Sequence, residues 1–314
     1  MTVLSLFSGA GGLDLGFKQA GHKILWANDI DSYAVETYKK NIGNHIIKAD
    51  IKEIDIDSLP KTDIVIGGFP CQGFSQANRF RNIEDERNHL YKFFYLTISK
   101  KQPKFFVAEN VKGILSLAKG KIIKQIEQDF ADAGYVVSVN VVNMADYGVP
   151  ETRQRVIILG QQKQFGPSMI IGLPPKTNSK DGKLLPKWRT IKEAIDRYPD
   201  PDSENEYLNH IYSKYKVIVR DYTAHRKTDP NKPSPTILAR GNGGGGVCAI
   251  PHYNGKRRLT IRESAAIQTF PDDFEFYGPM GSCYRQIGNA VPPLFAFQLA
   301  KCFTELENES SISI

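Results

Sequence analysis

The chain lacks long apolar runs, and it has few cysteines. No stretch of about eighteen consecutive apolar residues occurs among its 314 residues, so the sequence predicts no membrane span. The N-terminal segment also lacks the basic region and the long apolar stretch of a secretion signal, and we therefore expect a cytoplasmic protein. The four cysteines form no C-x-x-C pair, which argues against a structural zinc site and against a disulfide framework.

Positive charge is what the chain has in excess. Its net charge is +7, with 41% hydrophobic and 24% charged residues. That composition is typical of a globular protein with a full core. The charge permits a polyanionic partner such as a nucleic acid, but many basic proteins bind none, so charge alone does not decide the partner.

The first 165 residues alternate short β-rich segments with amphipathic helical segments. We predict strands at residues 2–6, 22–27, 63–66, 104–108, 136–143 and 155–160, and helices between them at 31–41, 91–100 and 122–133. This alternation predicts an α/β fold in which a mostly parallel sheet is covered by helices on both faces. Ligands of such sheets bind beyond the carboxyl ends of the strands.

The character of the chain changes between about residues 165 and 282. Prolines, glycines and polar residues cluster there, and the helical periodicity weakens. We therefore predict a smaller, irregular second domain at 169–283, beside a main domain formed by 1–168 and 284–314. A last helix is expected at 294–303, followed by a frayed tail from Glu307.

A glycine-rich turn, FSGAGG, runs from Phe7 to Gly12 directly after the first predicted strand. Glycines let a backbone turn tightly and approach a ligand at the start of a helix. Asp29 ends the second strand 17 residues after Gly12, where an acid holds ribose hydroxyls, and Asp50 with Ile51 is placed to meet an adenine ring. The turn alone leaves a nicotinamide cofactor, S-adenosylmethionine and a plain packing turn open.

Four further features follow predicted strands or precede the last helix. Cys71 lies in the segment GFPCQGFS after the strand at 63–66, and Glu109 follows the strand at 104–108. Arg153 and Arg155 open the strand that ends at Gly160, and a polar turn at 286–292 precedes the last helix. Singly, a cysteine is more often a buried apolar residue, and a glutamate or arginine a surface ion pair. Together they describe a reaction centre.

In these segments the chain resembles the C5-cytosine DNA methyltransferases of bacterial restriction–modification systems. The matching blocks follow in family order from Leu6 to Pro292: FSGAGG, NDID, the ADI step, GFPCQGFS, ENV, RQR, RRLTIRESAAIQTFPD and YRQIGNAVP. The resemblance implies a Rossmann-like S-adenosylmethionine-dependent methyltransferase domain with a mostly parallel sheet, plus a smaller irregular target-recognition domain. It also implies double-stranded DNA as substrate, no metal, and pairing with a cognate restriction endonuclease. The sequence leaves the oligomeric state open, and our default expectation is action as a monomer on a short site.

The resemblance assigns roles residue by residue. Cys71 would be the nucleophile, Glu109 would bind N3 and the exocyclic amine of the cytosine, and Arg155 would contact the base carbonyl and position Glu109. The residues that would hold S-adenosylmethionine are Phe7, Ser8, Gly9, Ala10, Gly11, Gly12, Asp29, Ile30, Asp50, Ile51, Leu90, Asn289 and Ala290. The residues that would hold the extruded nucleotide or its phosphates are Pro70, Gln72, Ser75 and Arg153.

The implied chemistry needs these groups because carbon 5 of cytosine is a poor nucleophile. Thiolate addition at carbon 6 breaks the aromaticity, and Glu109 at N3 would stabilise the developing charge. Since the base is buried in a stacked duplex, it must be extruded, and we predict that the segment 72–89 is a loop that closes over it. Two positions depart from the family pattern: Asn88 stands where glycine is usual, and Asp29 where glutamate is usual.

The family places target recognition in the irregular region. Arg240 and Asn242 are candidate base readers, because arginine suits guanine and asparagine suits adenine; the alternative is phosphate contact. The basic residues expected to face the DNA backbone are Lys227, Lys232, Lys256, Arg257 and Arg258.

Three other functions stay open on the sequence. One is a cytosine-5 methyltransferase acting on transfer RNA with the same fold. Another is a catalytically silent DNA-binding regulator, against which the intact Cys71, Glu109 and Arg155 argue. The third is a nicotinamide-dependent oxidoreductase, in which the ENV and RRLTIRE blocks would have no role.

Overall fold

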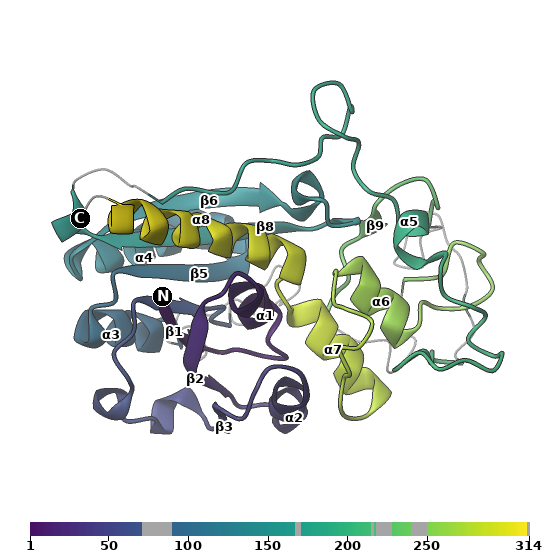
Figure 1. Ribbon diagram of the computed structural model, residues 1–314, viewed down its shortest axis with the longest axis horizontal. Helices are drawn as coiled ribbons and strands as arrows, with labels where there is room; N and C mark the ends of the chain where they lie inside the picture. Colours follow the sequence, from purple (N-terminus) through teal and green to yellow (C-terminus); the bar gives the residue numbers. More distant parts are fainter. Residues whose placement is uncertain (71–89, 167–170, 215–216, 218–227, 240–249, 313–314) are drawn as a thin grey trace.

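The computed structural model describes residues 1–70, 90–166, 171–214, 217, 228–239 and 250–312, with side chains as far as residue 307. Within these residues no helix is long and apolar enough to cross a membrane. The chain forms two lobes, which lie side by side in Figure 1. One lobe contains the main sheet and its helices, and the other contains shorter helices and loops.

A seven-stranded sheet forms the centre of the first lobe, in the order β3-β2-β1-β4-β5-β8-β6. The strands are β1 (Thr2–Leu6), β2 (Lys23–Asp29), β3 (Ile46–Lys48), β4 (Ile64–Gly67), β5 (Phe105–Val111), β6 (Tyr135–Asn143) and β8 (Gln154–Gln162). The pairs from β3 to β5 are parallel, whereas β8 is antiparallel to both β5 and β6. The mostly parallel sheet expected from the sequence is therefore confirmed.

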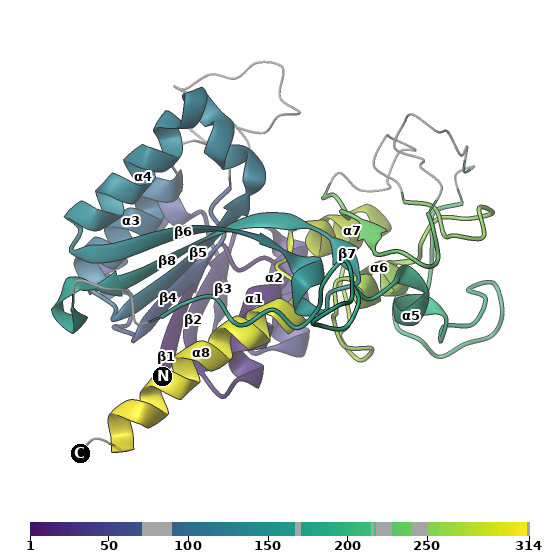
Figure 2. The ribbon, with the colours of Figure 1, turned by 90° about the horizontal axis from the view of Figure 1, so that it is seen from above.

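Helices cover both faces of this sheet, as Figure 2 shows. On one face lie α1 (Gly12–Gln19) and α8 (Pro293–Ile312), and on the other lie α3 (Leu90–Lys101) and α4 (Lys121–Asp132). Each face has its own apolar cluster, since Phe17 and Phe295 belong to the first and Phe94 and Phe130 to the second. Burial on both faces explains why the central strands read as continuous apolar runs.

The second lobe is held by short elements. They are α5 (Ile191–Ile195), α6 (Ile261–Ile267), α7 (Met280–Asn289) and the two-stranded sheet of β7 (Glu151–Thr152) with β9 (Ser234–Pro235). Thr190 and Thr260 begin α5 and α6 with complete capping boxes, which satisfy the free amide groups of a helix start. Their apolar faces pack with α7 and with α2 (Ser32–Asn41) of the first lobe.

Several boundaries differ from the sequence prediction. β5 extends three residues beyond the predicted end at 108, because it pairs with β8 as far as the pair Val111 and Arg155. Glu109 therefore lies within a strand and does not follow one. The predicted frayed tail from Glu307 is wrong, since α8 continues to Ile312. The helices α5 and α6 lie in the region where the helical periodicity weakens, and the predicted domain boundary at 283 falls inside α7.

Candidate active site

The glycine-rich turn sits at the carboxyl end of β1. Phe7, Gly9 and Gly11 all have positive φ, of 54°, 56° and 88°, so the backbone is bent back on itself three times within five residues. The Ser8 carbonyl accepts a hydrogen bond from the Gly11 amide at 2.9 Å, and α1 begins directly after the turn. No atom lies within 4 Å of a Cβ added at Gly9. At Gly9 the turn thus borders open space at the start of a helix, where the protein backbone is expected to contact a ligand.

Asp29 ends β2 beside this turn. Its Oδ2 accepts a hydrogen bond from the Gly9 amide at 2.8 Å, and its Oδ1 accepts one from the Asp31 amide at 2.9 Å. Burial raises the pKa of the carboxyl group, although the two amide donors act in the opposite direction. The next side chain, Ile30, is 64% exposed although it is aliphatic. An acid fixed against a glycine turn, with an uncovered apolar neighbour, fits a nucleoside whose ribose and base lie over the strand ends.

The end of β3 supplies another wall. Asp50 accepts a hydrogen bond from the Lys52 amide at 3.1 Å, and Ile51 is buried beneath it. Asn28, which is itself buried, ties this wall to the glycine turn: its side-chain amide donates to the Ala49 carbonyl, and its Oδ1 accepts from the Phe7 amide. The strand ends β1, β2 and β3 are thus joined by one asparagine.

The segment after α7 closes the turn from the C-terminal side. A Cβ at Gly12 would lie 2.4 Å from the Val291 carbonyl oxygen and 3.2 Å from the Ala290 Cβ. Only glycine permits this approach, because real Cβ atoms do not come so close to backbone atoms. Asn289 beside them is exposed. The structure therefore brings the predicted Ala290 to the predicted glycine turn.

Glu109 and Arg155 meet where β5 pairs with β8. The Nε atom of Arg155 lies 2.9 Å from Oε1 of Glu109, and both side chains are 11% exposed. The other carboxyl oxygen, Oε2, faces Gly68, since a Cβ added there would lie 3.1 Å from it. The carboxyl group is thus held by a cation on one side and bordered by the backbone after β4 on the other.

Asn110 fixes the backbone that leads to the predicted nucleophile. Its side-chain amide donates to the Phe69 carbonyl at 3.0 Å, and the Phe69 ring is buried against Phe94 at 6.0 Å between centroids. Pro70 is the last described residue of this segment. Several predicted site positions lie outside the described residues: Cys71, Gln72, Ser75, Asn88, Arg240 and Asn242, with the whole predicted loop 72–89.

The glycine turn, Asp29 and the Glu109–Arg155 pair all stand at one end of the sheet. Comparison with known proteins identifies the family of the chain. The family model of C-5 cytosine-specific DNA methylases matches residues 1–305. The chain belongs to this family. The resemblance found in the sequence is therefore confirmed, and the chain is an enzyme of the cytosine-5 DNA methyltransferase class.

Curated relatives of the methylase cover nearly its whole length. It is 42% identical to the type II methyltransferase M.NgoFVII of Neisseria gonorrhoeae, over 95% of this chain and 85% of the relative. It is 38% identical to the type II methyltransferase M.FnuDI of Fusobacterium nucleatum, over 97% and 94%. Among solved structures, an E. coli prophage protein described as a DNA modification methyltransferase has a TM-score of 0.73 at 25% identity, over 98% and 99%.

Arg153 of the methylase is not placed to hold a nucleotide. Its side chain is completely buried, and the guanidinium donates to the carbonyl oxygens of Ile237, Gly288 and Ala290 at 2.8 to 3.0 Å. Because the side chain has no exposed surface, the guanidinium does not face a phosphate of bound DNA in this structure. The expected contact between Arg153 and the extruded nucleotide is therefore corrected to a contact within the protein.

Two of the expected DNA-backbone residues are also engaged elsewhere. Arg257 makes a bidentate pair with Glu263 at 2.6 and 2.7 Å, and Arg258 is 1% exposed. Lys232 and Lys256 are exposed, as a phosphate contact requires, whereas Lys227 lies outside the described residues. Arg257 turns inward because Glu263 is buried in the capping box of α6, and a buried carboxylate needs a cation.

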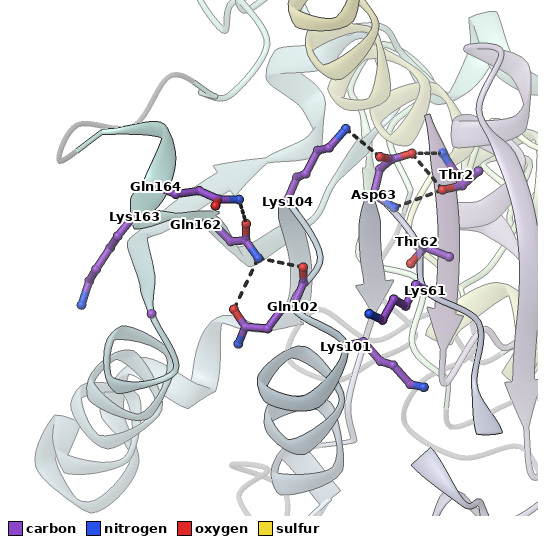
Figure 3. Close-up of a pocket in the computed structure, with 11 residues that line it drawn as sticks. Thr2, Lys61, Thr62, Asp63, Lys101, Gln102, Lys104, Gln162, Lys163 and Gln164 are labelled. Atoms are coloured by element: carbon purple, nitrogen blue, oxygen red, sulfur yellow. Dashed lines mark hydrogen bonds and ion pairs between the residues drawn. The ribbon is translucent and has the colours of Figure 1, made fainter. Parts of the chain in front are cut away.

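A surface hollow at the opposite end of the sheet contains none of the predicted site residues (Figure 3). Thr2, Asp63 and Lys104 line it at the amino ends of β1, β4 and β5, and Asp63 accepts from the Thr2 amide and pairs with Lys104 at 2.9 Å. Ligands of parallel sheets bind at the other, carboxyl ends. Among the described residues no group of three or more histidine, cysteine, aspartate and glutamate side chains is arranged to hold a metal.

Sequence reasoning missed three supporting residues. Asn28, Gly68 and Asn110 lie inside the NDID, GFPCQGFS and ENV blocks, yet no role was predicted for them. Their contacts are to backbone atoms or to a neighbouring carboxyl oxygen across strands, at sequence separations of up to 41 residues. Their presence in conspicuous blocks was the available signal.

Proposed function

We propose that the methylase transfers a methyl group from S-adenosylmethionine to carbon 5 of a cytosine extruded from a short specific duplex DNA sequence, through a covalent adduct between Cys71 and carbon 6. The observation that carries this proposal is the buried pair of Glu109 and Arg155, 2.9 Å apart, bordering the backbone of the segment in which Cys71 follows Pro70. Glu109, held in this way beside the segment that contains Cys71, supports a reaction on a cytosine ring that needs both an acid and a nucleophile.

The carboxyl ends of β1 to β3 fit the cofactor. The amides of the turn from Phe7 to Gly12 and the carboxylate of Asp29 would hold its polar parts, and the exposed Ile30 would cover its adenine ring. Asp50, Ile51 and Leu90 would complete that wall, and Asn289 with Ala290 would close it. When bound, S-adenosylmethionine supplies an electrophilic methyl group on its sulfonium. Asp29 is shorter than the usual glutamate, but the Gly9 amide already holds it against the turn.

The protein's own residues would activate the base. The Cys71 thiolate adds to carbon 6, and the ring electrons move toward carbon 5 and N3. Glu109, held by Arg155, hydrogen-bonds or protonates N3 and so stabilises that charge. After carbon 5 has gained its methyl group, a base removes its proton, the bond from sulfur to carbon 6 breaks, and aromaticity returns. Pro70, Gln72 and Ser75 would hold the extruded nucleotide.

The irregular region would read the DNA. We assign residues 169–283 to target recognition and 1–168 with 284–314 to catalysis, and we retain Arg240 and Asn242 as candidate base readers. The names of the relatives, type II methyltransferases, support a place in a restriction–modification system with a cognate endonuclease. We take the active form to be a monomer on double-stranded DNA.

Covalent trapping tests the proposal directly. The probe is a long duplex copied with 5-fluorodeoxycytidine triphosphate in place of deoxycytidine triphosphate, so that many short sequences carry fluorine at carbon 5 of cytosine. Fluorine cannot leave carbon 5 as a cation, so the covalent adduct cannot break down. With S-adenosylmethionine the wild-type protein should form a complex that survives denaturation, and Cys71→Ser should form none. Cys302→Ser, a partly buried cysteine on α8, is the matched control and should trap like wild type. Adduct formation by the Cys71→Ser protein would overturn the assignment, and trapping on transfer RNA instead of DNA would change the substrate.

A further inference from the structure

Arg153 joins three separate segments of the chain at one buried point. It lies between β7 and β8, two residues before Arg155, and its side chain has no exposed surface. Nη1 donates to the Ile237 carbonyl at 3.0 Å, and Nη2 donates to the Gly288 carbonyl at 2.8 Å and the Ala290 carbonyl at 3.0 Å. Ile237 comes from the region assigned to target recognition, whereas Gly288 lies in the last turn of α7 and Ala290 directly after that helix, where the chain closes the cofactor site.

Glu151 reinforces the first of these connections. It is also completely buried, and its Oε1 accepts a hydrogen bond from the Ile237 amide at 2.5 Å while lying 3.7 Å from Nη1 of Arg153. Both backbone groups of Ile237 are therefore held by this acid and base. The adjoining residues are fixed as well, since β7 pairs with β9 and Thr236 donates to the Thr152 carbonyl at 2.7 Å.

The end of α7 and the turn after it carry the connection to the cofactor site. On one side, a Cβ at Gly288 would lie 2.4 Å from the Ala239 amide nitrogen and 2.5 Å from the Leu238 carbonyl carbon, so the two backbones touch. On the other side, the Val291 carbonyl oxygen lies against Gly12 of the glycine turn. Residues 237–239 and 288–291 are thus in direct contact, and Arg153 ties the two segments together.

A buried charge is a costly way to join backbones, because a guanidinium loses its water shell there, and Nε of Arg153 is buried with no hydrogen-bond partner to replace it. Apolar packing of similar volume often stabilises a protein as well. The arrangement does more than apolar packing does, since three carbonyls from two parts of the chain must keep fixed positions around one planar group. Such a group gives the joined segments one common geometry.

We propose that Arg153, supported by Glu151, is a positioning residue through which DNA held at the target-recognition region sets the geometry of the cofactor site. This inference rests on the proposed function. Because coupling between two sites is reciprocal, DNA and cofactor each raise the affinity for the other by the same factor, and loss of Arg153 lowers that factor. Arg153 itself touches neither substrate.

The test measures the dissociation constant of S-adenosylhomocysteine by calorimetry, with and without a duplex that carries the methylated sequence. For the wild-type protein we expect DNA to lower this constant at least fivefold, as a coupling of ordinary size would. The ratio of the constant without DNA to the constant with DNA should fall close to one in Arg153→Met. It should be reduced in Glu151→Gln, and it should be higher in Arg153→Lys than in Arg153→Met. An unchanged ratio in a folded Arg153→Met or Glu151→Gln protein would refute the inference, as would a wild-type ratio of one.

Arg262 provides a matched control. It too is fully buried, and its guanidinium donates to three backbone carbonyls, those of Leu208, Pro271 and Phe274. All three belong to the second lobe, and none of them lies in residues 237–239 or 288–291, which Arg153 joins. Arg262→Lys should therefore cost stability, measured by thermal unfolding, and leave the DNA-dependent ratio intact. An equal decrease of the DNA-dependent ratio in Arg153→Met and Arg262→Lys would show a general effect of a disturbed second lobe and would refute the proposal. A wild-type protein that transfers no methyl group would instead refute the proposed function.

Discussion

Replacing Arg155 with methionine removes a guanidinium but keeps an unbranched side chain, and it leaves Glu109 without its cation. The two groups lie 2.9 Å apart and are each 11% exposed. Removing one partner of a buried pair costs about 3–5 kcal/mol, because the remaining charge stays buried without compensation. We expect Arg155→Met to lower the free energy of unfolding by up to that amount. General acid catalysis contributes roughly 10²–10⁴-fold to a rate, so we expect Arg155→Met to decrease kcat by a factor in that range.

A double-mutant cycle separates positioning from an independent role. Glu109→Gln keeps the shape of the side chain but removes the acid, and it should also lower kcat by roughly 10²–10⁴-fold. If Arg155 acts mainly by holding Glu109, removing Arg155 matters little once Glu109 is replaced. The kcat of the double variant should then be less than about tenfold below that of Glu109→Gln alone.

The assay is single-turnover transfer of labelled methyl groups at saturating DNA and cofactor. Arg257→Met is the control, because it breaks a pair of similar geometry, to Glu263 at 2.6 Å, away from the site. It should lower stability without a comparable loss of kcat. The reasoning is refuted if the two single losses simply multiply in the double variant.

Three further predictions follow from particular side chains. Gly68→Ala places a methyl group 3.1 Å from Glu109 Oε2 and should lower kcat roughly tenfold by displacing the carboxyl group, whereas Gly172→Ala, in open space, should not; equal kcat values for the two variants would contradict this. Burial raises the pKa of Asp14 to about 6, so the folded protein favours the neutral acid and loses stability as pH rises from 4 through 6. The difference between wild type and Asp14→Asn in urea unfolding should therefore change by roughly 2 kcal/mol between pH 4 and pH 7, and a constant difference would argue against it. Lys256→Ala should weaken binding to all duplexes alike and reduce the slope of log affinity against log salt by about one; an unchanged slope would exclude a phosphate contact.

The sheet was predictable from the sequence because its signals are local. β4 and most of β8 are buried on both faces, so they read as short apolar runs bounded by polar residues. The glycine turn and Asp29 were predictable for the same reason, since each directly follows such a run. The end of β5 was not predictable, because its last three residues are held by pairing with β8, more than forty residues away.

Burial of the arginines was beyond local patterns as well. Arg153 and Arg155 stand two residues apart in one block, yet the first is enclosed by carbonyls from residues 237, 288 and 290, whereas the second meets Glu109. Nothing in their neighbourhood in sequence distinguishes them. In the sequence, Arg257 and Arg258 likewise resemble a DNA-binding pair. In the structure, Arg257 pairs with the buried Glu263. Where a cation finds its partner is decided by the tertiary fold.

The most direct test of the account identifies the modified base. Mixed duplex DNA is incubated with the purified protein and S-adenosylmethionine carrying a labelled methyl group, then digested to nucleosides and analysed by mass spectrometry. We expect the label in 5-methyldeoxycytidine when the wild-type protein is used, and no labelled 5-methyldeoxycytidine with Cys71→Ser. Label in N4-methyldeoxycytidine or N6-methyldeoxyadenosine, or undiminished 5-methyldeoxycytidine from the Cys71→Ser protein, would contradict it.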